Sequence, residues 1–135
     1  MSAYLSEVIH KFTPLSGSDI PVAEDTAGIV ESLLANPSIV YKEVVGKGCI
    51  LGIVYPHFLN PEVVICQELG WWVEPEFRNT SVGIKLYNAF EREAVTRGAT
   101  KVMMISLEAQ SPQRMDRLYK KLGFRMLEHT YIKEV

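Results

Sequence analysis

The feature that most constrains the fold is a strand, a turn, a helix and a second strand that follow one another between residues 63 and 107. Residues 63–73 are rich in Val, Ile and Trp, a composition that favours a strand. Residues 101–107 are similarly rich in Val, Met and Ile. The intervening residues 83–97 carry apolar side chains at helical spacing, namely Leu86, Tyr87, Phe90 and Ala94. This order predicts a sheet with a helix packed against it.

Two helices are predicted before this unit. The first carries Leu5, Val8, Ile9 and Phe12 after a capping Ser2, and the second begins at Asp25 or Thr26 and ends at Asn36. Two further strands are expected at residues 38–45 and 49–55, joined by a tight turn at residues 46–48.

A last helix is predicted to begin at Ser111, which is followed by proline at the first helical position. Its buried stripe comprises Met115, Leu118, Tyr119 and Leu122. Residues 124–127 and 131–135 are expected to form a hairpin or two short strands.

These elements predict an α/β (α+β) fold in which about four helices flank both faces of a mixed sheet of about six strands. The chain has 135 residues, of which 47% are hydrophobic, so a single domain over residues 1–135 is expected. The formal net charge of -2 argues against a nucleic-acid binder. Cys49 and Cys66 lie in separate apolar runs without metal-ligand spacing, and no bilayer-spanning stretch or secretory signal is visible. A soluble cytoplasmic protein without a metal is therefore expected.

The turn between residues 73 and 83 is the best candidate for a binding site. It opens a helix, so the backbone N–H groups from about Asn79 to Gly83 lack helical partners and lie at the positive end of the helix dipole. Such a turn can bind a pyrophosphate, and Gly83 would let the backbone approach it closely. An ordinary connector with no ligand is the alternative.

Two motifs resemble those of the GNAT superfamily of N-acetyltransferases. Arg78, Ser81 and Gly83 resemble the superfamily's coenzyme A signature, and Val73, Pro75 and Glu76 resemble the usual approach to it. Residues 118–124, Leu-Tyr-Lys-Lys-Leu-Gly-Phe, resemble the second hallmark, a helix that ends in Tyr-x-x-Leu-Gly-Phe. Together with Gln67, Glu68, Leu69, Trp71 and Trp72, the motifs resemble small GNAT proteins often found in phages and prophages.

The resemblance implies that acetyl-CoA is the co-substrate and that an unidentified amine attacks its acetyl group directly, without an acyl-enzyme. The backbone of Val73 would bind the pantetheine arm, and the acetyl group would lie in a V-shaped gap between the strands at residues 63–73 and 101–107. The pyrophosphate would lie on the loop formed by Arg78, Asn79, Thr80, Ser81, Val82 and Gly83. Arg114, near the start of the last helix, is a further candidate for a phosphate contact.

Tyr119 is the candidate general acid, because a phenol stays protonated at neutral pH and can protonate a departing thiolate. A plain core tyrosine is the alternative. Glu68 is the candidate general base, and Gln67 is the neighbouring position that the alignment of motifs also allows. Since strand residues alternate, the two side chains face opposite ways unless a bulge exchanges them.

The adjacent Trp71 and Trp72 also face opposite ways, so one is expected in the core, while the other could wall the acceptor pocket.

The chain departs from the superfamily pattern at three points. Ser81 replaces a glycine, which would be costly if the backbone there had a positive φ. Pro112 replaces an asparagine that can contact the cofactor. The usual first strand is missing, which would leave a sheet edge open and predicts a homodimer.

The alternative function is a non-catalytic, phage-encoded protein of the GNAT fold that binds coenzyme A or a host protein. A toxin that acetylates aminoacyl-tRNA is a third reading, which the acidic charge balance disfavours.

Overall fold

A computed structural model describes residues 2–135. The α-helices are α1 (Ala3–Phe12), α2 (Thr26–Ala35), α3 (Val82–Thr96) and α4 (Pro112–Lys121). The strands are β1 (Ile39–Val44), β2 (Gly48–Pro56), β3 (Val64–Val73) and β4 (Lys101–Met103). Two short 3-10 turns, η1 (Thr13–Leu15) and η2 (Pro75–Phe77), complete the regular structure of this part of the chain.

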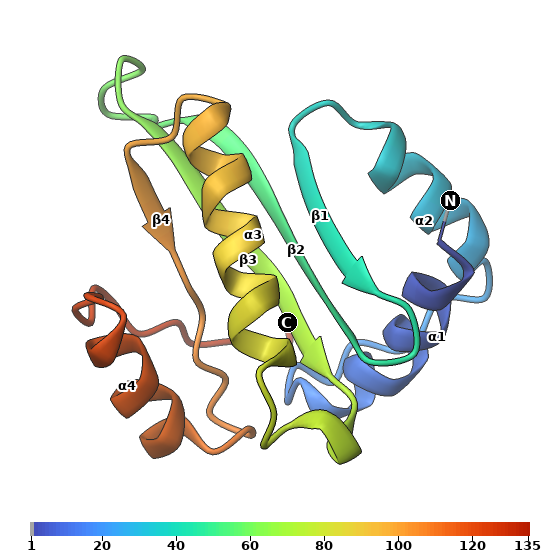
Figure 1. Ribbon diagram of the computed structural model, residues 1–135. Coiled ribbons are helices and arrows are strands. Elements are labelled where there is room, and N and C mark those ends of the chain that lie inside the picture. The colour runs from blue at the N-terminus through green and yellow to red at the C-terminus, as the bar shows by residue number, and fades with distance from the viewer. Residues whose placement is uncertain (1) are drawn as a thin grey trace.

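The strands form one mixed sheet in the order β1-β2-β3-β4 (Figure 1). β1, β2 and β3 pair in antiparallel fashion, whereas β4 pairs in parallel with β3, and α3 connects these two strands. The predicted mixed sheet with four helices is confirmed. Within residues 2–135 the chain starts with α1 rather than with a strand.

The expectation of about six strands is wrong, because the sheet has four and residues 124–135 form no strand. The apolar residues of this tail come in adjacent pairs, Met126 with Leu127 and Tyr131 with Ile132. A strand directs adjacent side chains to opposite faces, so this pattern gives no single apolar face to bury. The four side chains are 60 to 92% exposed.

One face of the sheet is covered by α1 and α2. The Ser2 hydroxyl caps α1 by accepting a hydrogen bond from the Leu5 N–H at 2.8 Å, and Asp25 caps α2 through the Gly28 N–H at 2.8 Å. The buried cluster on this face comprises Tyr4, Leu5, Val8, Val30, Cys49 and Trp72. The predicted caps and apolar stripes therefore place both helices correctly.

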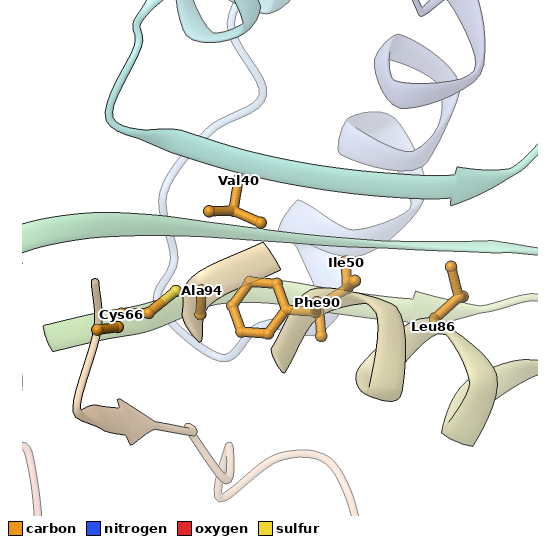
Figure 2. Close-up of a cluster of buried hydrophobic side chains, with 7 residues drawn as sticks. Val40, Ile50, Cys66, Leu86, Phe90 and Ala94 are labelled. Atoms are coloured by element: carbon orange, nitrogen blue, oxygen red, sulfur yellow. The ribbon is translucent and has the colours of Figure 1, made fainter. Parts of the chain in front are cut away.

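The opposite face is covered by α3. Its cluster includes Val40, Ile50, Cys66, Leu86, Phe90 and Ala94 (Figure 2). Gly52 is required for this packing, since a Cβ atom there would lie 2.5 Å from Cζ of Phe90. Because Phe90 is fully buried, α3 is held close to the sheet at this point. The prediction of helices on both faces is confirmed.

A β-bulge in β3 decides which side chains share a face. Leu51 pairs with Gly70 and Gly52 pairs with Glu68, so Leu69 is an extra residue. Without it, strict alternation would place Glu68 on the same side as Trp72. With it, Glu68 and Trp71 both follow Cys66 onto the α3 face, while Trp72 enters the cluster of α1 and α2.

None of the helices in residues 2–135 combines the length and hydrophobicity needed to cross a bilayer. In the same part of the chain, no three His, Cys, Asp or Glu side chains gather as metal ligands would. Cys49 and Cys66 are buried free thiols on opposite faces of the sheet.

Candidate active site

The candidate site lies where β3 and β4 part. Their ladder spans Ile65 to Gln67 on β3 and Lys101 to Met103 on β4. Beyond it the chain leaves the side of β3 and leads to α4 (Figure 1). The next link between the two segments is a side chain, because the N–H of Ile105 donates to Oε1 of Glu68 at 3.0 Å. The expected strand over residues 101–107 is thus only three residues long, since its backbone partner on β3 is replaced by a carboxylate.

Glu68 is buried, with 4% of its surface exposed. Burial disfavours the charged form and raises the pKa of its carboxyl group to about 7, although the hydrogen bond from Ile105 acts in the opposite direction. A carboxyl group with this pKa can exchange protons near neutral pH.

Tyr119 on α4 also bonds the backbone of Ile105. Its hydroxyl donates to the carbonyl oxygen of Ile105 at 2.7 Å, and its ring packs edge-on against Phe124. Burial is the main cause that raises the pKa of this phenol, with further contributions from the charges of Glu68 and Tyr87, so the hydroxyl stays protonated at neutral pH. Both predicted catalytic residues therefore meet at one residue, Ile105, where Glu68 accepts from the N–H and Tyr119 donates to the carbonyl oxygen.

Gln67 lies on the other face of β3. Its Oε1 accepts a hydrogen bond from the Tyr55 hydroxyl at 2.8 Å. The bulge at Leu69 comes after both residues, so it leaves Glu68 rather than Gln67 on the face of Tyr119.

The turn after β3 is held by Arg78. Its Nε donates to the carbonyl oxygen of Val73 at 2.8 Å, and its guanidinium lies 4.9 Å from the centre of the Trp72 ring. The Val73 carbonyl therefore already has a partner, and Arg78 positions the turn.

Ser81 has a φ of -80° and a ψ of 0°, which any residue adopts easily. The expected backbone cost of serine at this position is absent, because the turn needs no positive φ here. The Thr80 hydroxyl, not that of Ser81, accepts the Val82 N–H at 3.3 Å. At the start of α3, the N–H groups of Gly83 and Ile84 precede any helical acceptor.

Gly83 differs from Gly52 in what surrounds it. A Cβ atom at Gly83 would lie 3.4 Å from Cγ2 of Val73 and 3.7 Å from Cζ2 of Trp71, which is ordinary contact. Packing within the chain therefore does not require glycine at this position. On the far side of the turn, Nη2 of Arg114 on α4 lies 3.4 Å from Oδ1 of Asn79, so α4 approaches this loop.

Two site features were missed by sequence reasoning. Glu74 is buried and accepts hydrogen bonds from the Tyr4 hydroxyl at 2.6 Å, Nζ of Lys11 at 2.9 Å and Nε1 of Trp72 at 3.0 Å. Burial alone would raise the pKa of Glu74, but these three donors outweigh it and lower the pKa. These contacts tie the end of β3 to α1, and no local pattern around Glu74 signals Tyr4 and Lys11, which are distant in sequence.

The second missed feature is the indole N–H of Trp71, which is unpartnered within the described chain. Its Nε1 is buried and has no hydrogen-bond partner among residues 2–135. The ring lies 6.0 Å from that of Tyr87, on the α3 face.

Comparison with known proteins identifies a matching family. A model of the acetyltransferase (GNAT) family matches residues 15–124, which include both sequence motifs. Comparison with curated protein sequences gives no significant match.

Three solved structures illustrate the likeness. An aminoglycoside acetyltransferase from an uncultured soil metagenomic sample has a TM-score of 0.74 at 15% identity, covering 98% of this chain and 91% of its own. Glucosamine-6-phosphate N-acetyltransferase from Arabidopsis thaliana has a TM-score of 0.70 at 14% identity, with coverages of 98% and 94%. A protein of Clostridium acetobutylicum described as a predicted acetyltransferase, solved with acetyl-CoA, has a TM-score of 0.67 at 17% identity, with coverages of 96% and 88%. At these identities the likeness is one of fold.

Proposed function

The chain belongs to the acetyltransferase (GNAT) family, and on that premise we propose that it transfers the acetyl group of acetyl-CoA directly to a primary amine. The observation that carries this proposal is the convergence of Glu68 and Tyr119 on the backbone of Ile105. A carboxyl group and a phenol from segments far apart in sequence thus lie where β3 and β4 separate.

The turn suits the co-substrate for two reasons. Gly83 has no side chain to cover the first turn of α3, and packing within the chain does not require glycine there. A phosphate could therefore approach the free N–H groups of this turn. Trp71 keeps a buried donor without an acceptor in the described chain, on the same side of the sheet. Arg78, Asn79, Thr80, Ser81, Val82 and Gly83 would hold the pyrophosphate, and Val73 would border the pantetheine arm.

In the proposed reaction, the amine nitrogen attacks the acetyl carbonyl carbon, a C–N bond forms and the C–S bond breaks. Glu68 accepts a proton from the amine, for which a pKa of about 7 is suitable. Tyr119 donates its hydroxyl proton to the departing thiolate, turning away from the Ile105 carbonyl to do so. One proton is taken up and one is given, so the site returns to its starting state when a proton passes from Glu68 to Tyr119.

Binding of the co-substrate is tested by calorimetry with acetyl-CoA. Wild-type protein is expected to bind, and the Gly83→Trp variant is expected not to, because the indole would fill the space above the helix N-terminus. Absence of binding by the wild type would reject the cofactor assignment.

Catalysis is tested with a panel of amines. Amino sugars belong in it, since the names of two structural neighbours specify an aminoglycoside and glucosamine-6-phosphate. Tyr119→Phe is expected to lower turnover about a hundredfold while sparing acetyl-CoA affinity. Tyr87→Phe is the matched control, because its hydroxyl binds Glu91 rather than Ile105. Equal turnover in both variants would eliminate Tyr119 as the acid.

A non-catalytic coenzyme A-binding protein is the second candidate. The observation that favours it is that Glu68 and Tyr119 each already form a hydrogen bond with the backbone of Ile105. Retention of acetyl-CoA without acetyl transfer to any amine of the panel would support this function. The phage-type resemblance and a host-protein partner stay predictions.

We also propose a homodimer, because one edge of the sheet has no neighbouring strand in the described part of the chain. β1 is an outermost strand, and within residues 2–135 only β2 pairs with it. A second copy could pair along this edge. Sedimentation equilibrium is expected to give twice the chain mass, and a monomer mass at all concentrations would exclude the dimer.

A further inference from the structure

The indole N–H of Trp71 lacks a hydrogen-bond acceptor in the described part of the chain. The Nε1 atom is buried and finds no acceptor in residues 2–135. Buried donors in proteins nearly always have a partner, and one without a partner costs about 1 to 3 kcal/mol. A phenylalanine could fill similar space without this free-energy cost, so the presence of a tryptophan needs an explanation.

The position of the ring indicates where an acceptor would come from. Cζ2 of Trp71 lies 3.7 Å from the point where a Cβ atom of Gly83 would be. In an indole, Cζ2 and Nε1 are bonded to the same ring carbon, so the N–H belongs to the edge that borders Gly83. This edge lies between the sheet and the first turn of α3, on the face that also carries Glu68.

We propose that the indole N–H of Trp71 donates a hydrogen bond to an amide carbonyl oxygen of the pantetheine arm of coenzyme A. This inference rests on the proposed function and adds a specificity-determining residue to it. A neutral, buried donor suits a neutral amide carbonyl. The charged phosphates would instead lie at residues 78–81, which are exposed to solvent.

The assignment separates two parts of the ligand. Coenzyme A carries both a pantetheine arm and a phosphorylated adenosine, whereas adenosine 3′,5′-bisphosphate has no pantetheine. Calorimetry with the Trp71→Phe variant is expected to show about five- to tenfold weaker binding of coenzyme A. Binding of adenosine 3′,5′-bisphosphate is expected to be unchanged.

Three other results are possible, and each would contradict a different part of the proposal. Equal coenzyme A affinity in wild type and variant would overturn the hydrogen bond. An equal loss for both ligands would overturn its assignment to pantetheine. If wild-type protein binds no coenzyme A at all, the proposed function fails, which is a different result from failure of this inference alone.

A second measurement needs no change at Trp71. Protein labelled with ¹⁵N has two indole N–H signals, one from Trp71 and one from Trp72, whose N–H is already bonded to Glu74. Trp72→Phe assigns them by removing one. Coenzyme A is expected to move the Trp71 signal downfield and to slow its exchange with deuterium. Adenosine 3′,5′-bisphosphate is expected to do neither. A Trp71 signal that coenzyme A leaves unmoved would overturn the proposal even if the phenylalanine variant did not fold.

Discussion

Trp71 and Trp72 are neighbours in sequence, yet their indole N–H groups meet opposite conditions. Nε1 of Trp72 donates to Glu74 at 3.0 Å, within a network that also satisfies Tyr4 and Lys11. Nε1 of Trp71 is buried without an acceptor in the described residues. On the α1 side of the sheet, these buried polar groups are hydrogen-bonded to one another. On the α3 side near Gly83, the N–H of Trp71 has no hydrogen-bond partner in the described residues.

This difference separates residues that hold the fold from residues available to a ligand. On the α1 side, changes should cost stability and leave coenzyme binding unaffected. On the α3 side, changes should alter binding or pH dependence at a smaller cost in stability. The following predictions test this division in order of decreasing effect.

Glu74→Ala is expected to lower the free energy of unfolding by about 3 to 5 kcal/mol. The variant leaves the buried Tyr4 hydroxyl and the Trp72 N–H without their acceptor, and Lys11 without its ion pair. Urea denaturation measures the loss. Glu76→Ala, at an exposed acid two residues away, is the control and should change stability by less than about 0.5 kcal/mol. Coenzyme A affinity of the folded variant should be unchanged, and a large loss of affinity would contradict the division.

The two buried carboxyl groups predict opposite pH dependences. Folding raises the pKa of Glu68 to about 7, so the folded state holds this proton more tightly than the unfolded chain. The stability contributed by Glu68 is complete below about pH 4.3 and is lost as pH rises to about 7. Glu74 has a lowered pKa, so its contribution is present above the ordinary glutamate pKa and is lost in acid.

Glu68→Gln should remove the first of these dependences. The side-chain carbonyl of glutamine can still accept the Ile105 N–H, but it cannot ionise. Between pH 4.5 and 8, wild-type protein is expected to lose about 3 kcal/mol of stability relative to the variant. Thermal or urea unfolding across this pH range measures the difference. Parallel stability curves for the two proteins would show that Glu68 is not titrating in the buried site.

The general fold could be predicted because it depends on local signals. Capping by Ser2 and Asp25, and the apolar stripes of the helices, act within a few residues and were recognised correctly. The strand count was overestimated because the tail has apolar residues but no alternation. Strand number depends on whether one face can be buried, which apolar content alone does not determine.

The site was less accessible to prediction because its geometry depends on contacts between distant segments. The motifs identified Glu68, Tyr119 and the turn, but not their meeting at Ile105. A bulge is decided by pairing with β2, so the sequence of β3 alone could not place Trp71 and Glu68 on one face. Two of the three partners of Glu74, Lys11 and Tyr4, lie 63 and 70 residues away, beyond any local pattern.

Gly83→Ala gives the smallest change in stability and the closest test of the open side. Residue 83 is helical, and an added Cβ makes only ordinary contacts with Val73 and Trp71. The variant is therefore expected to be more stable by about 0.4 to 1 kcal/mol, through the lower entropy of the unfolded chain. Coenzyme A affinity should nevertheless fall, because the methyl group occupies the approach to the helix N-terminus.

The matched control is Asn88→Ala, at an exposed position of the same helix. Alanine is the better helix former there as well, so a similar gain of about 0.5 kcal/mol is expected, with coenzyme A affinity unchanged. A gain in stability together with a loss of affinity, at Gly83 alone, would mean that glycine is kept for the ligand and not for the fold. If the Gly83→Ala variant binds coenzyme A as tightly as the wild type, the backbone at this turn is not approached by the ligand, and the two sides of the sheet are less different than their tryptophans indicate.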